Sequence, residues 1–208
     1  MIYGSGSRTN WRLNGAMPES KPEAMTSSTG MTSSLNMTRV ILTGFMGAGK
    51  STVGPLLAAR LGWQFVDADR AIEAAYGTTI TALFAEHGEP WFREVERATI
   101  LEFLGIDHLV LALGGGAVED TRTLEAMLAS PGTRLVHLDA SFETVLERCR
   151  GTEASRPVLQ DRLQLESRYA RRRPLYRQAH LNVPVDGIDA ETAAETVLNT
   201  LSSLPALG

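Results

Sequence analysis

The sequence predicts an α/β protein in which helices flank a parallel sheet. Two observations favour this fold class: short apolar runs alternate with amphipathic helical patterns from Arg39 onward, and a glycine-rich turn joins the first run to the first helix. Strands that alternate with helices are connected by βαβ crossovers, which place the strands parallel and bury both faces of the sheet. Ligands of such sheets bind beyond the carboxyl ends of the strands. We therefore expect the functional residues to lie where strands end.

The order of the elements follows from the spacing of the apolar residues. Short apolar runs predict strands at Arg39–Thr43, Gln64–Asp67, Leu109–Leu113, Arg134–Leu138 and Leu181–Val185. Apolar residues at helical spacing predict helices at Ser51–Leu61, Arg70–Tyr76, Glu89–Leu104, Leu124–Ala129, Phe142–Arg148, Arg162–Ala170 and Ala190–Leu204. In the long third helix, we expect the apolar stripe that includes Leu101 and Leu104 to face the core.

Residues 1–36 differ in composition from the rest of the chain. They are rich in Ser and Thr and contain few large aliphatic side chains, so they cannot bury enough apolar surface to offset the entropy of ordering. We predict a disordered tail over residues 1–36 and a folded domain over residues 37–208. Because the tail contains Glu19 and Glu23 and lacks a continuous apolar segment, we favour an over-extended start over a targeting peptide.

Composition excludes several functional classes. The chain has 208 residues and is 43% hydrophobic, which is enough to form a globular core. No run of about 18 apolar residues occurs, so we predict no membrane span. The single cysteine, Cys149, excludes an internal disulfide and fits a cytoplasmic location. The net charge of −4 argues against a general nucleic-acid-binding protein.

A phosphate-binding motif follows the first predicted strand. Residues 44–51 read Gly-Phe-Met-Gly-Ala-Gly-Lys-Ser and match the Walker A pattern, which predicts a P-loop NTPase fold. The glycines let backbone N–H groups surround phosphate oxygens, and the next helix presents its positive N-terminus to the same anion. Lys50 would contact the β- and γ-phosphates, and the Ser51 hydroxyl would bind Mg²⁺. Since Lys21 is the only other lysine, a chemical role for Lys50 is favoured over a purely structural glycine turn.

Two carboxylates close the second predicted strand. Asp67 and Asp69 are two residues apart, and both can face the phosphate site where the chain turns. One can hold Mg²⁺ through water while the other accepts a hydrogen bond from a substrate hydroxyl. The alternative is that Asp69 only caps the following helix.

Other candidate residues follow the third strand and lie in the arginine-rich second half. Gly114-Gly115-Gly116 either allows a small ligand to approach the backbone closely or forms a flexible turn. Arg93 and the run Arg171-Arg172-Arg173 could be solvated, yet arginines are concentrated over residues 148–177 of an acidic chain, which favours an anionic ligand. RNA binding is a competing hypothesis, but no aromatic residues are interleaved with the arginines.

Together these motifs resemble those of shikimate kinases over residues 39–204. The matching segments are Gly44–Thr52, Asp67–Asp69, Phe92-Arg93 with Glu96, Leu113–Ala117, Arg156-Pro157 and Arg172–Tyr176. The resemblance implies a fold like that of nucleoside-monophosphate kinases, with a mobile lid at residues 150–161. It also implies Mg²⁺-dependent transfer of the γ-phosphate of ATP to the 3-hydroxyl of shikimate, in the biosynthesis of chorismate and aromatic amino acids.

The resemblance further implies roles for the matching residues. Catalysis would depend on Lys50, Asp69 and Arg156. ATP would be bound by Gly47, Ala48, Gly49, Lys50, Ser51, Thr52, Arg150 and Arg156. Shikimate would be bound by Asp69, Arg93, Gly114, Gly115, Gly116 and Arg172, with the two arginines on its carboxylate. Mg²⁺ would be held by Ser51 and Asp67. One departure is that residues 185–189 lack the basic residue that family members often carry near adenine.

Three alternatives remain open at this stage. A related small-molecule kinase, such as a gluconate kinase, would share the Walker motif but would not need Arg93, the glycine triplet and Arg172 together. A GTP-dependent switch is disfavoured because the chain has no Asn-Lys-x-Asp element. A non-catalytic nucleotide- or RNA-binding module is disfavoured by the intact set of Lys50, Ser51, Asp67 and Asp69. We expect a monomer that binds ATP and shikimate and does not bind nucleic acid or membranes.

Overall fold

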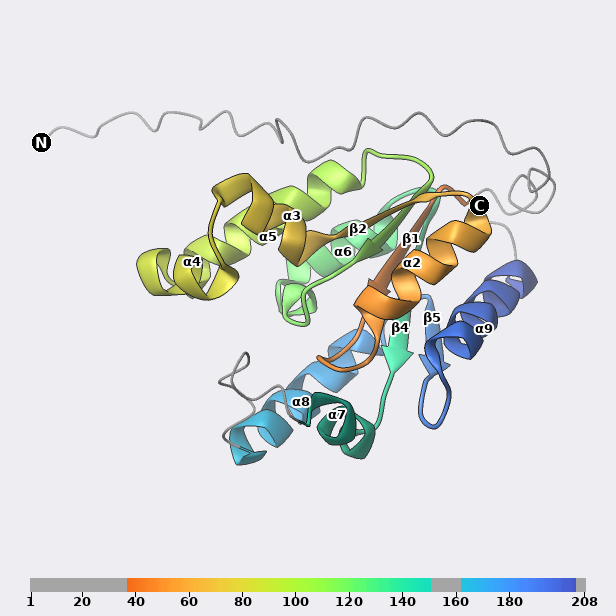
Figure 1. The fold of residues 1–208 in the computed structure, drawn as a ribbon. Helices are drawn as coiled ribbons and strands as arrows, with labels where there is room; N and C mark the ends of the chain where they lie inside the picture. The colour runs from red at the N-terminus through yellow and green to blue at the C-terminus, as the bar shows by residue number, and fades with distance from the viewer. Residues whose placement is uncertain (1–36, 151–161, 205–208) are drawn as a thin grey trace, which may run out of the picture.

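The computed structural model describes residues 37–150 and 162–204 (Figure 1). A five-stranded sheet with the order β2-β3-β1-β4-β5 forms its centre, and every strand pairing is parallel. The prediction of a parallel α/β sheet is therefore confirmed. The predicted tail at residues 1–36 lies outside the described residues. Of the predicted lid at residues 150–161, residues 151–161 lie outside them as well, and these include Arg156.

The strands form where the apolar runs predicted them. The centre of the sheet consists of β1 (Arg39–Thr43), β3 (Leu109–Ala112) and β4 (Thr133–Asp139), which are almost entirely buried. The edges are β2 (Gln64–Asp67) and β5 (Leu181–Pro184), and each has exposed positions. Proline ends β5, which an edge strand tolerates because one row of its N–H groups has no partner strand.

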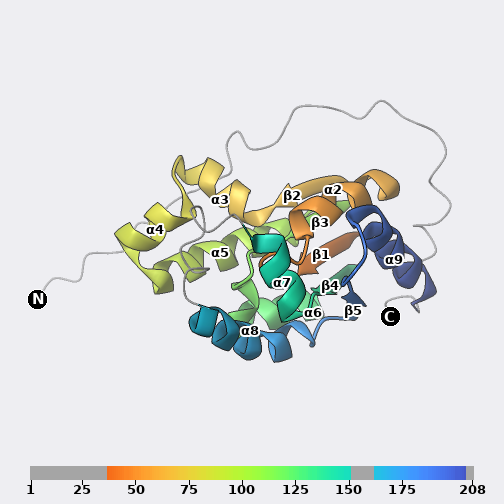
Figure 2. The same cartoon turned by 60° about the horizontal axis from the view of Figure 1, so that its bottom comes forward.

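Helices cover both faces of the sheet. On one face, α2 (Lys50–Leu61) and α9 (Ala190–Ser203) pack against each other, and on the other lie α5 (Glu89–Phe103) and α6 (Thr121–Ala129), as Figures 1 and 2 show. Beyond the carboxyl end of β4 lie α7 (Phe142–Cys149) and α8 (Arg162–Tyr176). No helix in this described part of the chain is long and apolar enough to cross a membrane.

A lobe projects from the β2 side of the sheet. It consists of α3 (Ala68–Tyr76), α4 (Ile80–His87) and α5, at the left of Figure 1. A small apolar cluster of Ile72, Leu83 and Phe92 joins these three helices. The sequence patterns did not predict α4, which has only eight residues. It is stabilised mainly by this packing, since isolated helices of that length are marginal in water.

The chain order of the strands creates a crevice at one edge of the sheet. β1 lies between β3 and β4. The chain leaves β1 toward β2, at one edge of the sheet, and leaves β4 toward β5, at the other edge. In open α/β sheets, ligands bind at such a switch point, outside the carboxyl ends of the strands. The glycine-rich turn follows β1, Asp67 ends β2, and the glycine triplet follows β3. The three predicted motifs therefore meet at this edge.

Two details differ from the prediction. We expected a helix that ends at Ala170, whereas α8 continues through Pro174 to Tyr176. The buried Tyr176 ring anchors the end of the helix, and its hydroxyl donates to the Gly115 carbonyl. Leu101 was expected in the core but is 40% exposed, because α5 turns its neighbours toward the sheet instead.

Candidate active site

The loop between β1 and α2 is shaped by its glycines. Gly44 has a φ of 143° and Gly49 a φ of 102°, values that residues with a side chain rarely adopt. At Gly44, a Cβ would also come within 2.8 Å of the Leu138 carbonyl oxygen. Gly49 is the N-cap of α2 and supplies no side-chain cap, so the first N–H groups of α2 remain available to a ligand. The loop therefore offers a backbone cradle for an anion.

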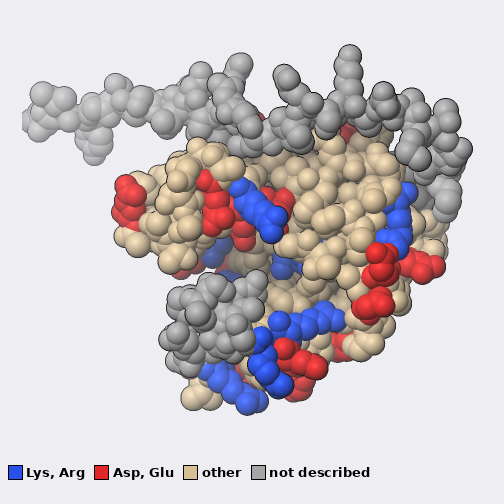
Figure 3. All heavy atoms as spheres, in the orientation of Figure 1, with Lys and Arg blue, Asp and Glu red and all other residues tan. Residues whose placement is uncertain are grey.

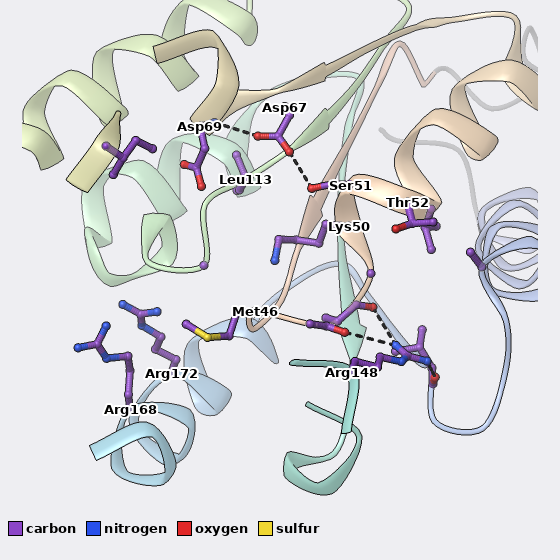
Figure 4. A pocket seen from close by; sticks show the side chains of 18 of the residues that line it. Met46, Lys50, Ser51, Thr52, Asp67, Asp69, Leu113, Arg148, Arg168 and Arg172 are labelled. Atoms are coloured by element: carbon purple, nitrogen blue, oxygen red, sulfur yellow. Dashed lines mark hydrogen bonds between the residues drawn. The ribbon is translucent and has the colours of Figure 1, made fainter. Parts of the chain in front are cut away.

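Lys50 begins α2 and extends over this loop (Figure 4). Its ammonium group donates to the carbonyl oxygens of Gly44 at 2.7 Å and Phe45 at 3.1 Å. The loop's own backbone thus holds the positive charge where phosphate oxygens would approach the cradle.

Asp67 links the end of β2 to both the loop and the lobe. Its Oδ2 accepts a hydrogen bond of 2.7 Å from the Ser51 hydroxyl. Its Oδ1 accepts from the backbone N–H groups of Asp69 at 3.1 Å and Arg70 at 3.3 Å, so Asp67 is the N-cap of α3. The alternative in which Asp69 caps this helix is therefore wrong: the cap is Asp67, and the Asp69 side chain is left for another role.

The Asp69 carboxyl faces the cavity from the first turn of α3. Burial raises its pKa to about 6, the Asp67 carboxylate adds to this rise, and the Lys50 ammonium opposes it. A carboxyl group with such a pKa is ionised at neutral pH but still a better proton acceptor than an ordinary aspartate.

The glycine triplet after β3 makes room for acidic and basic side chains. A Cβ on Gly114 would lie 2.5 Å from Oδ1 of Asp69 and 2.9 Å from Oε1 of Glu96. A Cβ on Gly116 would lie 2.5 Å from Nη2 of Arg93. These glycines are therefore required for space by side chains of the protein itself, whereas close approach of a ligand to the triplet stays a prediction.

Arg93 is held by carboxylates of its own helix. Its Nη1 donates to Glu96 at 2.6 Å and its Nη2 to Glu89 at 2.9 Å. Glu96 is buried, and burial raises its pKa to about 7 even though Arg93 pulls in the opposite direction. The spacing of Arg93 and Glu96, three residues apart on a helix, is the sequence signal that could have identified this pair.

Arginines of α8 form the opposite wall of the cavity. Arg168 and Arg172 lie side by side and point into it (Figure 4). Arg172 is buried and donates from Nε and Nη2 to Glu119, on the short helix η1 (Ala117–Glu119), at 2.9 and 2.6 Å. Arg171 donates to the other oxygen of Glu119. No sequence pattern singled out Glu119, because its arginine partners are far away in the chain.

These walls enclose one cavity of about 1080 Å³. Figure 3 shows the molecule hollowed between the lobe and the part below it, with basic side chains in the hollow. This volume is at the upper end of the range for ligand pockets, so a nucleotide and a small substrate can share it. The predicted residues that line the cavity are Gly47, Ala48, Gly49, Lys50, Ser51, Thr52, Asp67, Asp69, Arg93, Gly115 and Arg172. Gly114 and Gly116 lie behind this lining, against Asp69 and Arg93.

Arg148 supplies the basic group that the loop before α9 lacks. It lines the cavity from the end of α7 and donates to the carbonyl oxygens of Val185 at 2.7 Å and Ile188 at 3.2 Å. It also approaches the Ala48 carbonyl of the glycine-rich loop at 3.4 Å. The sequence resemblance indicated Arg150 instead, which follows α7 and is exposed and not among the lining residues.

The fold and the cavity together define a class of protein. A glycine-rich loop with a lysine, a serine–aspartate pair beside it and an arginine wall opposite it are the parts of a P-loop kinase for a small anionic substrate. A model of the shikimate kinase family matches residues 46–202. The chain belongs to the shikimate kinase family.

Individual relatives agree with this assignment. The chain is 41% identical to a shikimate kinase of Persephonella marina over 152 residues, which cover 73% of this chain and 91% of that relative. It is also 41% identical to a shikimate kinase of Thermus thermophilus over 167 residues, 79% of this chain and 90% of that one. A solved structure of shikimate kinase from Acinetobacter baumannii in complex with shikimate superimposes with a TM-score of 0.76 at 33% identity, covering 83% and 97% of the two chains.

More distant structures share only the fold. A gluconokinase from Sinorhizobium meliloti superimposes with a TM-score of 0.53 at 18% sequence identity, over 81% of this chain and 94% of that chain. At this level of identity, the similarity supports the P-loop kinase fold and gives no support to gluconate as the substrate.

Proposed function

We propose that ATP and shikimate bind side by side in this cavity, where the γ-phosphate of ATP passes to the 3-hydroxyl of shikimate. The reaction belongs to the biosynthesis of aromatic amino acids. One observation carries the assignment of the site: the phosphate cradle with Lys50 and the arginine wall with Arg172 line a single cavity that also contains Asp69. A nucleotide-binding module without catalytic function would need only the first of these parts.

ATP occupies the side formed by the glycine-rich loop. Residues Gly47 to Thr52 surround its phosphates, with the N–H groups of Ala48 and Thr52 exchanging their bonds to the Phe45 and Gly49 carbonyl oxygens for phosphate oxygens. Lys50 likewise exchanges the carbonyl oxygens of its own loop for phosphate oxygens. The adenine lies toward the gap that Arg148 bridges between the glycine-rich loop and the loop before α9. Arg148, in place of Arg150, is proposed to flank the adenine, and Arg156, outside the described residues, to approach the transferring phosphate.

The residues beside Lys50 fit a magnesium ion. The Ser51 hydroxyl and Asp67 Oδ2 are 2.7 Å apart next to the phosphate cradle, and hard oxygen donors of this kind are the ligands that Mg²⁺ prefers. We propose that Ser51 binds the ion directly and Asp67 holds it through water. When bound, the ion would offset negative charge on the β- and γ-phosphates.

Shikimate occupies the side between the lobe and α8. Arg93 and Arg172 bind its carboxylate, because a planar guanidinium matches the two oxygens of a carboxylate. Gly115 lines the cavity and provides room for the ring beyond the end of β3, while Gly114 and Gly116 provide room for the Asp69 and Arg93 side chains. Asp69 accepts a hydrogen bond from the 3-hydroxyl, orients it toward the γ-phosphate and takes its proton as the new bond forms.

The experiment that tests this function measures ATP consumption with shikimate, with gluconate and with neither acid. We expect ATP consumption only when shikimate is present, and mass spectrometry should identify the product as phosphorylated shikimate. Turnover with gluconate in place of shikimate would assign the chain to another kinase activity, and ATP binding without turnover on either acid would indicate a non-catalytic module.

We also propose that the protein acts as a cytoplasmic monomer whose residues 37–208 fold as one domain. A single large hydrophobic cluster runs from β1 to α9, which supports one folding unit over the described residues. Light scattering during gel filtration measures the oligomeric state directly, and a dimer at working concentration would contradict this part of the proposal.

A further inference from the structure

Glu119 is the carboxylate that holds the arginine wall together. Its Oε2 accepts two hydrogen bonds from Arg172, at 2.9 Å from Nε and 2.6 Å from Nη2. Its Oε1 accepts two from Arg171, at 3.1 Å from Nε and 2.9 Å from Nη2. One carboxylate therefore fixes two guanidinium groups of α8 through both of its oxygens.

This arrangement determines which edge of Arg172 a substrate can use. The Nε and Nη2 groups face Glu119, whereas Nη1 lies 3.6 Å from the position of a Cβ on Gly115. Gly115 lines the cavity, so Nη1 lies on the side proposed for the substrate, where the Tyr176 side chain also hydrogen-bonds Arg172. The side chain of Arg172 is only 7% exposed, which leaves it little freedom to turn once Glu119 is in place.

The charges around Glu119 explain why such a fixing group is needed. Arg168, Arg171 and Arg172 occupy adjacent positions on α8 and repel one another. The pKa of Arg168 is lowered, first by burial and then by the charge of Arg172. Burial would raise the pKa of Glu119, yet hydrogen bonds from Arg172 and Arg171 outweigh it and lower that pKa, so the carboxylate is ionised at neutral pH.

We propose that Glu119 is a positioning residue for substrate binding: it turns the Arg172 guanidinium so that Nη1 meets the carboxylate of the substrate. This inference rests on the proposed function, in which Arg172 binds that carboxylate. Glu119 itself does not contact the substrate. Its effect is therefore expected on substrate affinity and not on the transfer step, because the carboxylate contact is similar in the ground and transition states.

The chain offers a matched control for this role. Glu94 also bridges two arginines, accepting from Arg97 at 2.7 Å and from Arg122 at 2.6 Å. This second cluster lies on the surface and does not line the cavity. Glu94→Gln and Glu119→Gln thus remove the same charge from the same kind of cluster, and only one of them borders the proposed substrate site.

The test compares the steady-state kinetics and melting temperatures of Glu119→Gln, Glu119→Asp and Glu94→Gln with those of the wild type. For Glu119→Gln we expect the shikimate KM to rise about tenfold, because misalignment of Arg172 should cost the equivalent of one charge-assisted hydrogen bond to the substrate. The kcat and the ATP KM should stay within about twofold of the wild-type values. Glu119→Asp keeps the charge on a shorter side chain and should recover part of the affinity. Glu94→Gln should leave all three constants unchanged.

A double-mutant cycle decides whether Glu119 acts through Arg172. In an Arg172→Ala background, Glu119→Gln should raise the shikimate KM no further, because the group that it positions is gone. Independent, additive effects would overturn the inference, as would an unchanged shikimate KM in the single variant or an equal loss in kcat. A wild type that does not phosphorylate shikimate contradicts the proposed function and this inference together, whereas an active wild type with an unaffected Glu119→Gln contradicts only the inference.

Discussion

The two walls of the cavity are assembled in different ways. The phosphate cradle on the nucleotide side is one continuous segment, from Gly44 to Ser51, and its lysine is held by carbonyl oxygens of that same segment. The substrate side is collected from separate elements: Arg93 from α5, Gly115 after β3, and Arg172 from α8.

The groups that hold the cations also differ. Lys50 is oriented by the backbone carbonyl oxygens of Gly44 and Phe45, whose positions are set whenever the loop folds. Arg93 and Arg172 are oriented by the side-chain carboxylates of Glu96 and Glu119. The arginines of the substrate side can therefore be misaligned by a single side-chain substitution that leaves the fold intact, whereas the contacts that orient Lys50 come from the backbone. Substitutions on the two sides should accordingly affect different kinetic constants.

Asp69 lies where the two sides meet, and its substitution should have the largest effect. Asp69→Asn keeps the size of the side chain but removes the charge that accepts the hydroxyl proton, so kcat should fall by about 10²–10⁴-fold. The fold should be retained because the cap of α3 is Asp67, and the melting temperature at neutral pH should rise slightly, because Asn replaces a carboxylate whose pKa is raised by burial. Steady-state kinetics and thermal unfolding measure both, and a near-normal kcat would remove Asp69 from the mechanism.

The pH profile of the wild type gives an independent check on Asp69. Only the ionised carboxylate can accept a proton, and its pKa is raised to about 6. The value of kcat/KM for shikimate should therefore rise as the pH increases through about 6 and then level off. An acidic limb near the ordinary pKa of an aspartate would show that the buried environment does not act on this group.

Lys50 tests the nucleotide side alone. Lys50→Met removes the positive charge that lies beside the transferring phosphate, so kcat should fall about 10²–10³-fold. The affinity for shikimate, measured directly by calorimetry, should stay unchanged. Lys50→Arg should fail as well, because a planar guanidinium is bulkier than the ammonium that fits against the Gly44 and Phe45 carbonyls. Full activity of the arginine variant would show that the loop needs only a positive charge.

Arg172 tests the substrate side. Arg172→Ala should raise the shikimate KM about tenfold to a hundredfold, because a charge-assisted contact to the carboxylate is lost, and should leave ATP affinity unchanged. Arg93→Ala should behave in the same way. Arg122→Ala is a suitable control, since Arg122 pairs with Glu94 and Asp120 away from the cavity. Weaker ATP binding with normal shikimate binding would place Arg172 on the nucleotide side instead.

The smallest expected effect concerns stability at Glu96. Its pKa is about 7 in the folded chain against an ordinary value of 4.5, so the folded state binds the proton more tightly and stability falls as the pH rises through that interval. Glu96→Gln cannot undergo this loss. The difference in melting temperature between the variant and the wild type should therefore shift in favour of the variant by a few degrees when the pH is raised from 5 to 8. A difference that is constant with pH would contradict the buried, proton-binding state of Glu96.

Sequence patterns predicted the structure most accurately where it depends on neighbouring residues. The apolar runs placed all of the strands of the described sheet, and the glycine pattern placed the loop after β1, because strand burial and left-handed backbone are properties of a few adjacent residues. The same patterns were less accurate for α4 and for the end of α8. These elements depend on packing against α5 and on the anchoring of Tyr176 at Gly115, which are contacts between distant segments.

The same distinction applies to the site. Adjacent residues account for the phosphate cradle and for Lys50, because the carbonyl oxygens that hold the Lys50 ammonium belong to the same loop. The acids at the end of β2 are likewise placed by their position where the strand turns into α3. An arginine side chain, in contrast, has many rotamers, and its direction depends on the carboxylate that it meets. Tertiary packing brings Glu119 to Arg172 and Arg148 to the loop before α9. These long-range hydrogen bonds fix the orientation of the guanidinium groups and therefore decide which of their donors face the cavity.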